Sequence, residues 1–129
     1  MVDTSALVAI LLDESDADRF ALALSGAPIR LLSAVTRVEI SCVIEGRKGE
    51  IGRADVDVML RDGGFEIVGV TPQQAEIAVD AFRRFGKGRH RARLNLGDCF
   101  SYALAVATGH RLLFKGDDFS HTDIRPALS

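Results

Sequence analysis

The chain has 129 residues, of which 47% are hydrophobic and 26% charged, and these values suit one compact domain over residues 1–129 rather than two. The formal net charge of −2 excludes the strongly basic balance of many nucleic-acid-binding proteins, so any such partner must be recognised by a local cluster of charges. No run approaches the ~18 apolar residues of a membrane-spanning helix and no secretory signal pattern opens the chain, so we expect a cytoplasmic protein without a membrane partner.

Hydrophobic periodicity and turn residues predict alternating short strands and helices. In chain order we expect a strand at residues 1–2, helices over about 4–12 and 15–24, a strand at 29–33, helices over 34–49 and about 53–61, a strand at 65–70, helices over 71–86 and 96–108, and strands at 111–114 and 121–124. The helix over 71–86 has the clearest start, because Thr71 suits the N-cap and Pro72 the first helical position. This alternation predicts the α/β class, with a mostly parallel sheet covered by helices on both faces.

Acidic residues follow the ends of the expected strands or lie in the first turns of the following helices. Asp3 follows the first strand, Glu39 and Asp98 lie near helix starts, and Asp117 and Asp118 follow the strand at 111–114. In right-handed crossovers these positions share one edge of the sheet, which is also where ligands bind. We therefore expect carboxylates from four distant segments to converge.

Converging carboxylates repel one another, and the repulsion raises some of their pKa values unless a cation lies between them. Mg²⁺ or Mn²⁺ suits such oxygen ligands best, because the chain lacks a cluster of thiolates or imidazoles. Cys42 and Cys99 lie apart in apolar helical sequence, and we expect both to be buried. The chemistry indicated is hydrolysis of a phosphodiester by one or two bound ions.

Helix capping explains the same acids without any metal. Thr36 with Glu39, and Asn95 with Asp98, both have the spacing of a capping box, and Asp3 suits the N-cap of the first helix. The paired acids after the strand at 111–114 also suit an ordinary turn. Both interpretations remain open at this point.

Four segments, VDTSALVAIL, VEISCVIEGR, RRFGKGRHRARLNLGDCFSYALA and LLFKGDDFSHTDI, resemble in sequence and order the PIN-domain ribonucleases, specifically the VapC-type toxins of bacterial toxin–antitoxin pairs. The resemblance implies a three-layer α/β/α sandwich around a mostly parallel, roughly five-stranded sheet. It also implies a Mg²⁺- or Mn²⁺-dependent endoribonuclease that acts on RNA, forms a homodimer and is held inactive by a VapB-type antitoxin.

The resemblance assigns catalytic and metal-binding roles to four acids, Asp3, Glu39, Asp98 and Asp117. The family's fourth acid falls on Gly116 here, so Asp117 or Asp118 must substitute, and we favour Asp117. The acids of the D-x-S and G-D motifs would bind the ion directly and the other two through water. Ser5 could hydrogen-bond one of the ligand carboxylates.

A basic run precedes the G-D motif, with six of the chain's 16 Lys and Arg residues between positions 83 and 93. Because it leads into the acidic edge, it could neutralise the RNA backbone. The residues expected to contact RNA are Lys87, Arg89, His90, Arg91 and Arg93. A solvated basic surface without a partner is the alternative.

Other classes of protein fit the pattern less well. A haloacid-dehalogenase-like phosphatase needs a second acid where Ser5 stands, and a receiver domain needs a phosphoacceptor aspartate that FEIVGVTPQQ does not supply. A catalytically inactive PIN-like module that binds RNA or protein is the non-enzymatic alternative, and the intact acids speak against it. We predict a metal-dependent endoribonuclease.

Overall fold

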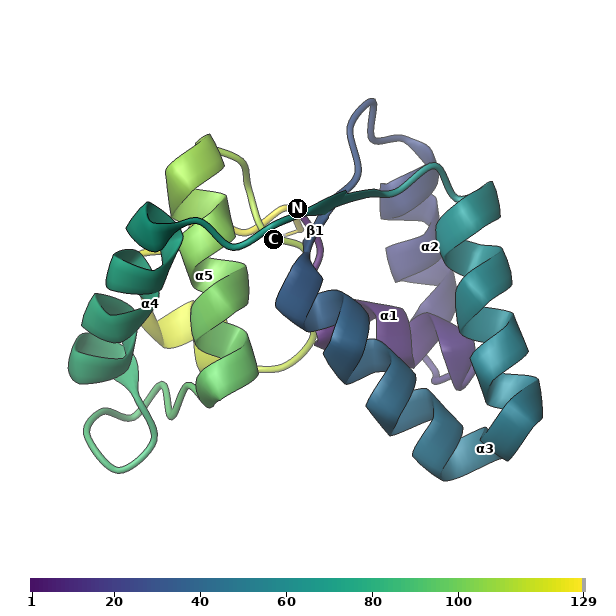
Figure 1. Cartoon of the computed structure of the whole chain (residues 1–129), viewed down its shortest axis with the longest axis horizontal. Coiled ribbons are helices and arrows are strands. Elements are labelled where there is room, and N and C mark those ends of the chain that lie inside the picture. The colour runs from purple at the N-terminus through teal and green to yellow at the C-terminus, as the bar shows by residue number, and fades with distance from the viewer. Residues whose placement is uncertain (129) are drawn as a thin grey trace.

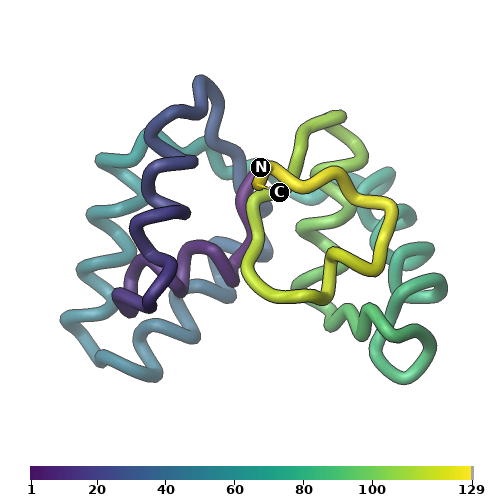
Figure 2. The backbone as a smooth tube through the Cα atoms, turned by 180° about the vertical axis from the view of Figure 1, so that it is seen from behind, coloured from purple at the N-terminus to yellow at the C-terminus, as the bar shows by residue number. Residues whose placement is uncertain are grey.

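The computed structural model describes residues 1–128. Its elements are α1 (Thr4–Leu11), α2 (Ala17–Ser25), β1 (Leu31–Ser33), α3 (Ala34–Asp62), β2 (Glu66–Val68), α4 (Pro72–Phe85), α5 (Leu96–Thr108) and the short 3-10 helix η1 (Asp118–His121). The longer helices form two groups, α1 to α3 on one side of the short extended segments and α4 with α5 on the other (Figure 1). The reverse view shows the same division, with both ends of the chain near the middle (Figure 2). The expected α/β class is confirmed.

The extended segments in the middle are very short. β1 pairs with β2 in parallel, and the Val2 N–H donates to the Leu31 carbonyl on the other side of β1 at 2.9 Å. Isolated parallel bridges then join Val2 to Leu113 and Leu112 to Pro126. The expectation of five strands is therefore not confirmed, because the segments at 1–2 and 111–114 contribute only isolated bridges and the one at 121–124 contributes none in the described structure.

Two hydrophobic cores lie on opposite sides of these segments. Leu113 belongs to the core beneath α1, α2 and α3, whereas its neighbour Leu112 belongs to the core beneath α4 and α5. Successive side chains of an extended segment point to opposite faces, so this division follows from strand geometry. The segment at 111–114 thus holds the two halves together and carries the chain to the Asp117–Asp118 turn.

Three local expectations are corrected. The two helices expected at 34–49 and 53–61 form one element, α3, with a break at Gly49, where φ is 62°. The edge strand expected at 121–124 does not form: His121 ends η1, residues 122–124 are irregular, and the last pairing occurs at Pro126. Cys42 is exposed, because the buried face of α3 is formed by Ile40 and Ile44. Within residues 1–128, no helix has both the length and the hydropathy needed to cross a bilayer.

Candidate active site

Asp3 lies at the end of the first extended segment, and its side chain is only 2% exposed. It is the N-cap of α1, where its Oδ2 accepts hydrogen bonds from the Ser5 N–H at 3.0 Å and the Ser5 hydroxyl at 2.7 Å. Its Oδ1 accepts a hydrogen bond of 2.6 Å from the hydroxyl of Ser101 on α5. Donors from two helices therefore fix the orientation of this buried carboxylate.

A wider set of hydroxyl contacts surrounds Asp3. The Ser5 hydroxyl also accepts the Lys115 N–H at 2.9 Å, and the Ser101 hydroxyl lies 3.3 Å from that of Thr36 on α3. The expectation that Ser5 binds a candidate ligand carboxylate is confirmed for Asp3. These contacts connect α1, α3, α5 and the segment after Leu113 around one carboxylate.

Glu39 reaches the same region from α3. The hydroxyl of Thr4 donates a short hydrogen bond to its Oε1. A side chain at Gly97 would overlap its carboxylate, because a Cβ atom placed there would collide with Oε2. Glycine at this position of α5 thus lets Glu39 lie directly against the turn that carries Asp98.

Asp98 and Asn95 form the expected capping box at the start of α5. The Asp98 N–H donates to Asn95 Oδ1 at 2.9 Å, and the Asn95 N–H donates to Asp98 Oδ2 at 3.0 Å. The other expected box, between Thr36 and Glu39, does not form, because α3 starts earlier with Ser33 as its N-cap. Capping therefore accounts for one oxygen of Asp98 and for neither oxygen of Glu39.

The electrostatic environment raises the pKa of Asp98 from 3.8 to about 7. Burial is the largest cause, and the negative charges of Asp3, Asp118 and Glu39 add to it, while the hydrogen bond from Asn95 lowers the pKa. Three acids, each from a different segment, therefore act on the charge of Asp98. The acid of the last segment that acts on Asp98 is Asp118.

Asp117 lies differently from its neighbour Asp118. Asp117 is the N-cap of η1 without a side-chain capping bond, and it lines a cavity together with Asp16 and Arg19. The segment is anchored by Phe119, which is buried in the core beneath α4 and α5. A further anchor is the Tyr102 hydroxyl, which donates to Asp123 Oδ1 at 2.7 Å.

The four acids do not form a complete ligand set as they stand. Within residues 1–128, no group of three or more Asp, Glu, His or Cys side chains is arranged to hold a metal ion. The carboxylates of Asp3 and Asp98 are already held by hydrogen bonds within the chain. Ser5 and Ser101 donate to Asp3, and Asn95 donates to Asp98. None of the four acids makes an ion pair with a Lys or Arg in the described part of the chain.

The basic run covers the last turn of α4 and the loop between α4 and α5. A parallel bridge between Gly86 and Leu94 closes the loop just before the Asn95 cap, so the loop borders the acidic turn. Lys87, Arg89, Arg91 and Arg93 are all exposed. His90 is half-buried, its Nδ1 accepts the Ala92 N–H at 3.0 Å, and its ring packs edge-on against Phe85. His90 therefore shapes the loop that presents the four cations.

Sequence reasoning missed two groups that act on the acids. Ser101 lies three residues after Asp98 and therefore on the same face of α5, which is the signal that could have identified it. Thr4, next to Asp3, resembles an ordinary first helical residue, and nothing local indicates that it bonds Glu39. Both contacts depend on how α1, α3 and α5 pack.

Comparison with known proteins gives consistent results over nearly the whole chain. The PIN domain family model matches residues 1–125. The crystal structure of VapC20 of Mycobacterium tuberculosis, described as a toxin that cleaves the sarcin–ricin loop, superposes with a TM-score of 0.76 over 97% of this chain and 98% of that one. Its sequence is 20% identical to this chain, so the likeness shows the fold.

Relatives of higher identity carry VapC names. Ribonuclease VapC30 of Mycobacterium tuberculosis is 52% identical over 124 residues, which cover 96% of this chain and 95% of that protein. Ribonuclease VapC of Mycolicibacterium smegmatis is 50% identical over 124 residues, 96% of each chain. Ribonuclease VapC42 of Mycobacterium tuberculosis is 50% identical over 131 residues, 100% of this chain and 99% of that one. The chain therefore belongs to the PIN-domain family and, within it, to the VapC-type toxins.

Proposed function

We propose that the protein is an endoribonuclease, the toxin of a toxin–antitoxin pair, and that it hydrolyses RNA phosphodiester bonds with Mg²⁺ or Mn²⁺. The observation that carries the proposal is the group of three acids near Asp98, whose pKa is raised to about 7 by burial and by this neighbouring negative charge. Such a group is unfavourable by itself and becomes favourable when a cation neutralises it. Membership among the VapC-type toxins supports RNA as the substrate.

The donor set fits a hard divalent cation. All four side chains offer carboxylate oxygens, which Mg²⁺ and Mn²⁺ prefer over nitrogen or sulfur. Asp3 and Asp98 would bind the ion directly, and Glu39 would hold it through water. For the fourth acid we favour Asp118 over Asp117, because the charge of Asp118 acts on Asp98. Bound there, the ion would supply a water of lowered pKa and would offset charge on the phosphate.

The chain's own groups prepare the site for this chemistry. Ser5 and Ser101 hold the carboxylate of Asp3 in one orientation, and Asn95 holds one oxygen of Asp98, leaving the other oxygen without a described hydrogen-bond donor. Thr4 holds one oxygen of Glu39 and leaves the second for water. Side chains fixed in this way lose little entropy when they bind ion and substrate.

We propose that the exposed cations of the loop before α5 bind the RNA backbone. The loop ends at the cap of α5, so phosphates beside the scissile bond would meet it directly. Lys87, Arg91 and Arg93 are free to point to solvent, while the guanidinium of Arg89 lies over the ring of Phe82 at 5.5 Å from its centre. His90 would contribute mainly by holding the loop in shape.

We also propose a homodimer formed through α4 and α5. A groove of about 360 Å³ between these helices is lined by apolar side chains together with Arg83 and Arg89, and its Leu96 is 73% exposed. Exposed apolar surface of this kind marks protein interaction sites. If the dimer forms here, Leu96→Glu will sediment as a monomer, whereas Ile67→Glu, which changes an exposed residue of β2, will not.

A VapB-type antitoxin and a cytoplasmic location complete the proposal. Their support is the membership of the chain among the VapC-type toxins, since a toxin of this kind must be neutralised where its RNA substrate lies. Co-purification of the chain with an antitoxin that suppresses cleavage of RNA would test the proposed antitoxin partner.

Incubation of the purified protein with total RNA, with Mg²⁺ and with EDTA, followed by mapping of the new RNA ends, tests the proposal. We expect discrete cuts that require the metal and that Asp98→Asn abolishes. RNA binding without any cut would instead favour an inactive PIN-like binding module. Equal cleavage by wild type and Asp98→Asn would refute the proposed site.

A further inference from the structure

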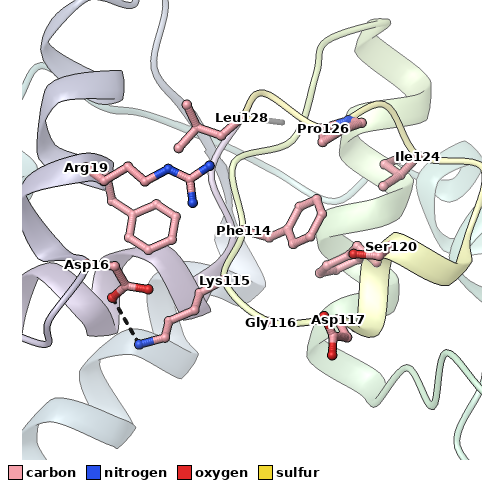
Figure 3. Close-up of a pocket in the computed structure, with 12 residues that line it drawn as sticks. Asp16, Arg19, Phe114, Lys115, Gly116, Asp117, Ser120, Ile124, Pro126 and Leu128 are labelled. Atoms are coloured by element: carbon pink, nitrogen blue, oxygen red, sulfur yellow. Dashed lines mark hydrogen bonds and ion pairs between the residues drawn. The ribbon is translucent and has the colours of Figure 1, made fainter.

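A cavity of about 490 Å³ lies next to the acidic site, between the start of α2 and the C-terminal segment. Figure 3 shows Asp16 and Arg19 on the α2 side, Ser120 and Ile124 on the opposite side, and Phe114 projecting between them. None of the four acids proposed to hold the ion lines this cavity, whereas Asp117, the neighbour of Asp118, does. It is therefore a separate hollow that adjoins the site.

The cavity and the acidic site share one wall, which residues 114–117 form. The Lys115 N–H donates to the Ser5 hydroxyl at 2.9 Å, and this hydroxyl donates to Asp3 Oδ2 at 2.7 Å. At the other end of the wall, Asp117 lines the cavity while Asp118 acts on the acidic site. When an RNA strand lies across the acids, a neighbouring nucleotide of that strand can therefore reach the cavity.

One half of the cavity is aromatic and aliphatic. The rings of Phe114 and Phe119 lie 5.2 Å apart between centres and are inclined by 53°, and Phe114 is half-buried, so part of its surface remains available. Phe20, Ile124 and Leu128 also line this half. Aromatic faces of this kind stack on the bases of single-stranded RNA, and the volume lies within the usual range for small-ligand sites.

The other half offers acceptors rather than an available cation. Lys115 Nζ pairs with Glu14 Oε1 at 2.6 Å and with Asp16 Oδ1 at 3.0 Å, so two acids offset its charge (Figure 3 shows the second pair). Arg19 is engaged in an interaction of its own. Asp16 and Asp117 therefore give this half acceptors for N–H donors.

We propose that this cavity binds the base of a nucleotide next to the scissile bond and prefers bases with an amino group, cytosine, adenine or guanine, over uracil. The base would stack on Phe114 and donate an amino N–H to Asp16 or to Asp117. The role beside the scissile bond rests on the proposed ribonuclease activity and adds to it a basis for the choice of cleavage site. Carboxylates accept hydrogen bonds from base amino groups, which uracil lacks.

Binding of 5′-CMP and 5′-UMP to the metal-free protein, followed by NMR chemical shifts, tests the site directly. The two ligands have the same phosphate and sugar, so a difference between them reports the base alone. We expect CMP to bind about fivefold more tightly or better, with shifted amide signals in residues 114–120. Equal affinities, or shifts confined to residues 87–93, would overturn the proposal.

Matched variants assign the effect to the cavity. Phe114→Leu removes the stacking surface and Asp16→Asn removes a charged acceptor, and both should reduce the preference for CMP over UMP. Phe65→Leu changes another half-buried phenylalanine, packed on the other core, and should leave the preference unchanged. An intact preference in both Phe114→Leu and Asp16→Asn, with thermal unfolding confirming that both are folded, would overturn the assignment.

Cleavage of an RNA pool with randomised sequence separates this proposal from the ribonuclease itself. Wild type should show depletion of uracil at one position beside the cut, and Phe114→Leu should cut with that depletion reduced. Discrimination between CMP and UMP without any RNA cleavage would refute the proposed ribonuclease activity and would support the proposed base-binding cavity. Cleavage without preference at any flanking position would overturn the base site and leave the ribonuclease.

Discussion

Replacing Asp98 with Asn should make the metal-free protein more stable while abolishing its activity. Burial, together with the charges of Asp3, Asp118 and Glu39, raises the pKa of Asp98 from 3.8 to about 7. The folded protein therefore binds more protons than the unfolded chain between about pH 4 and 7, so its stability falls as pH rises through this window. Three pKa units correspond to ~4 kcal/mol at most, and water around this half-buried side chain reduces the expected effect to ~2 kcal/mol.

The variant Asp98→Asn keeps an acceptor for the Asn95 N–H but carries no charge. We expect its free energy of unfolding to exceed that of wild type by ~2 kcal/mol at pH 8, and the difference to shrink toward zero near pH 4. Urea unfolding in EDTA at several pH values measures this difference. Asp13→Asn is the control, because Asp13 is exposed and lies outside the group of acids that act on Asp98, and its difference from wild type should not vary in this way.

Metal ions provide a second measurement on the same pair. Mn²⁺ that binds the folded wild type will raise its stability, whereas Asp98→Asn should gain little, so the gap between the two will narrow or reverse. RNA cleavage by the variant should fall to the level seen in EDTA. A stability difference that stays constant from pH 4 to pH 8 would refute the reasoning, because it would mean that the charge of this carboxylate is not penalised in the fold.

Three further changes test other parts of the site. Gly97→Ala should displace the neighbouring glutamate carboxylate and lower the rate of RNA cleavage about tenfold or more, whereas Gly46→Ala, where an added Cβ meets nothing within 4 Å, should leave the rate unchanged. Ser101→Ala removes the hydrogen bond that Ser101 donates to the buried carboxylate of Asp3. Calorimetry should then show that Mn²⁺ binds about tenfold more weakly, because a metal ligand that loses its hydrogen-bond partner is less well oriented. Exchanging Arg89 and Arg91 for Gln together should reduce the slope of log affinity for single-stranded RNA against log salt by about 1.4, and an unchanged slope would contradict contact with the backbone.

Local signals in the sequence predicted most of the helices and the position of the acids. Thr71 and Pro72 define the start of α4, where the Thr71 hydroxyl accepts the Gln74 N–H, and Asn95 with Asp98 defines the start of α5. Such caps depend on residues within four positions of one another, so they can be recognised without knowledge of the fold. The order of strands and helices then places the acids at one edge.

The remaining features depend on packing between distant segments. That Ser101 bonds Asp3, and that Gly97 makes room for Glu39, follows from the approach of α5 to α1 and α3, which no local pattern records. Whether Asp117 or Asp118 acts on the other acids also depends on packing, because it is set by the orientation of the turn that carries both residues. The strands were overestimated because segments of two or three paired residues are too short to be delimited by alternation.

The capping and metal-binding interpretations of Asp98 are compatible, and the geometry explains why. The cap uses Oδ2, which accepts the Asn95 N–H, and leaves Oδ1 without a described hydrogen-bond donor. The cap alone does not account for burying a carboxylate near three others, because a capping contact contributes ~0.5–2 kcal/mol and works equally well on an exposed turn. Burial and like charge act against that contribution, as the raised pKa shows. A buried charge near three other acids in the first turn of α5 makes the metal-free protein less stable. Such a loss of stability is expected where the charge serves ligand binding rather than folding.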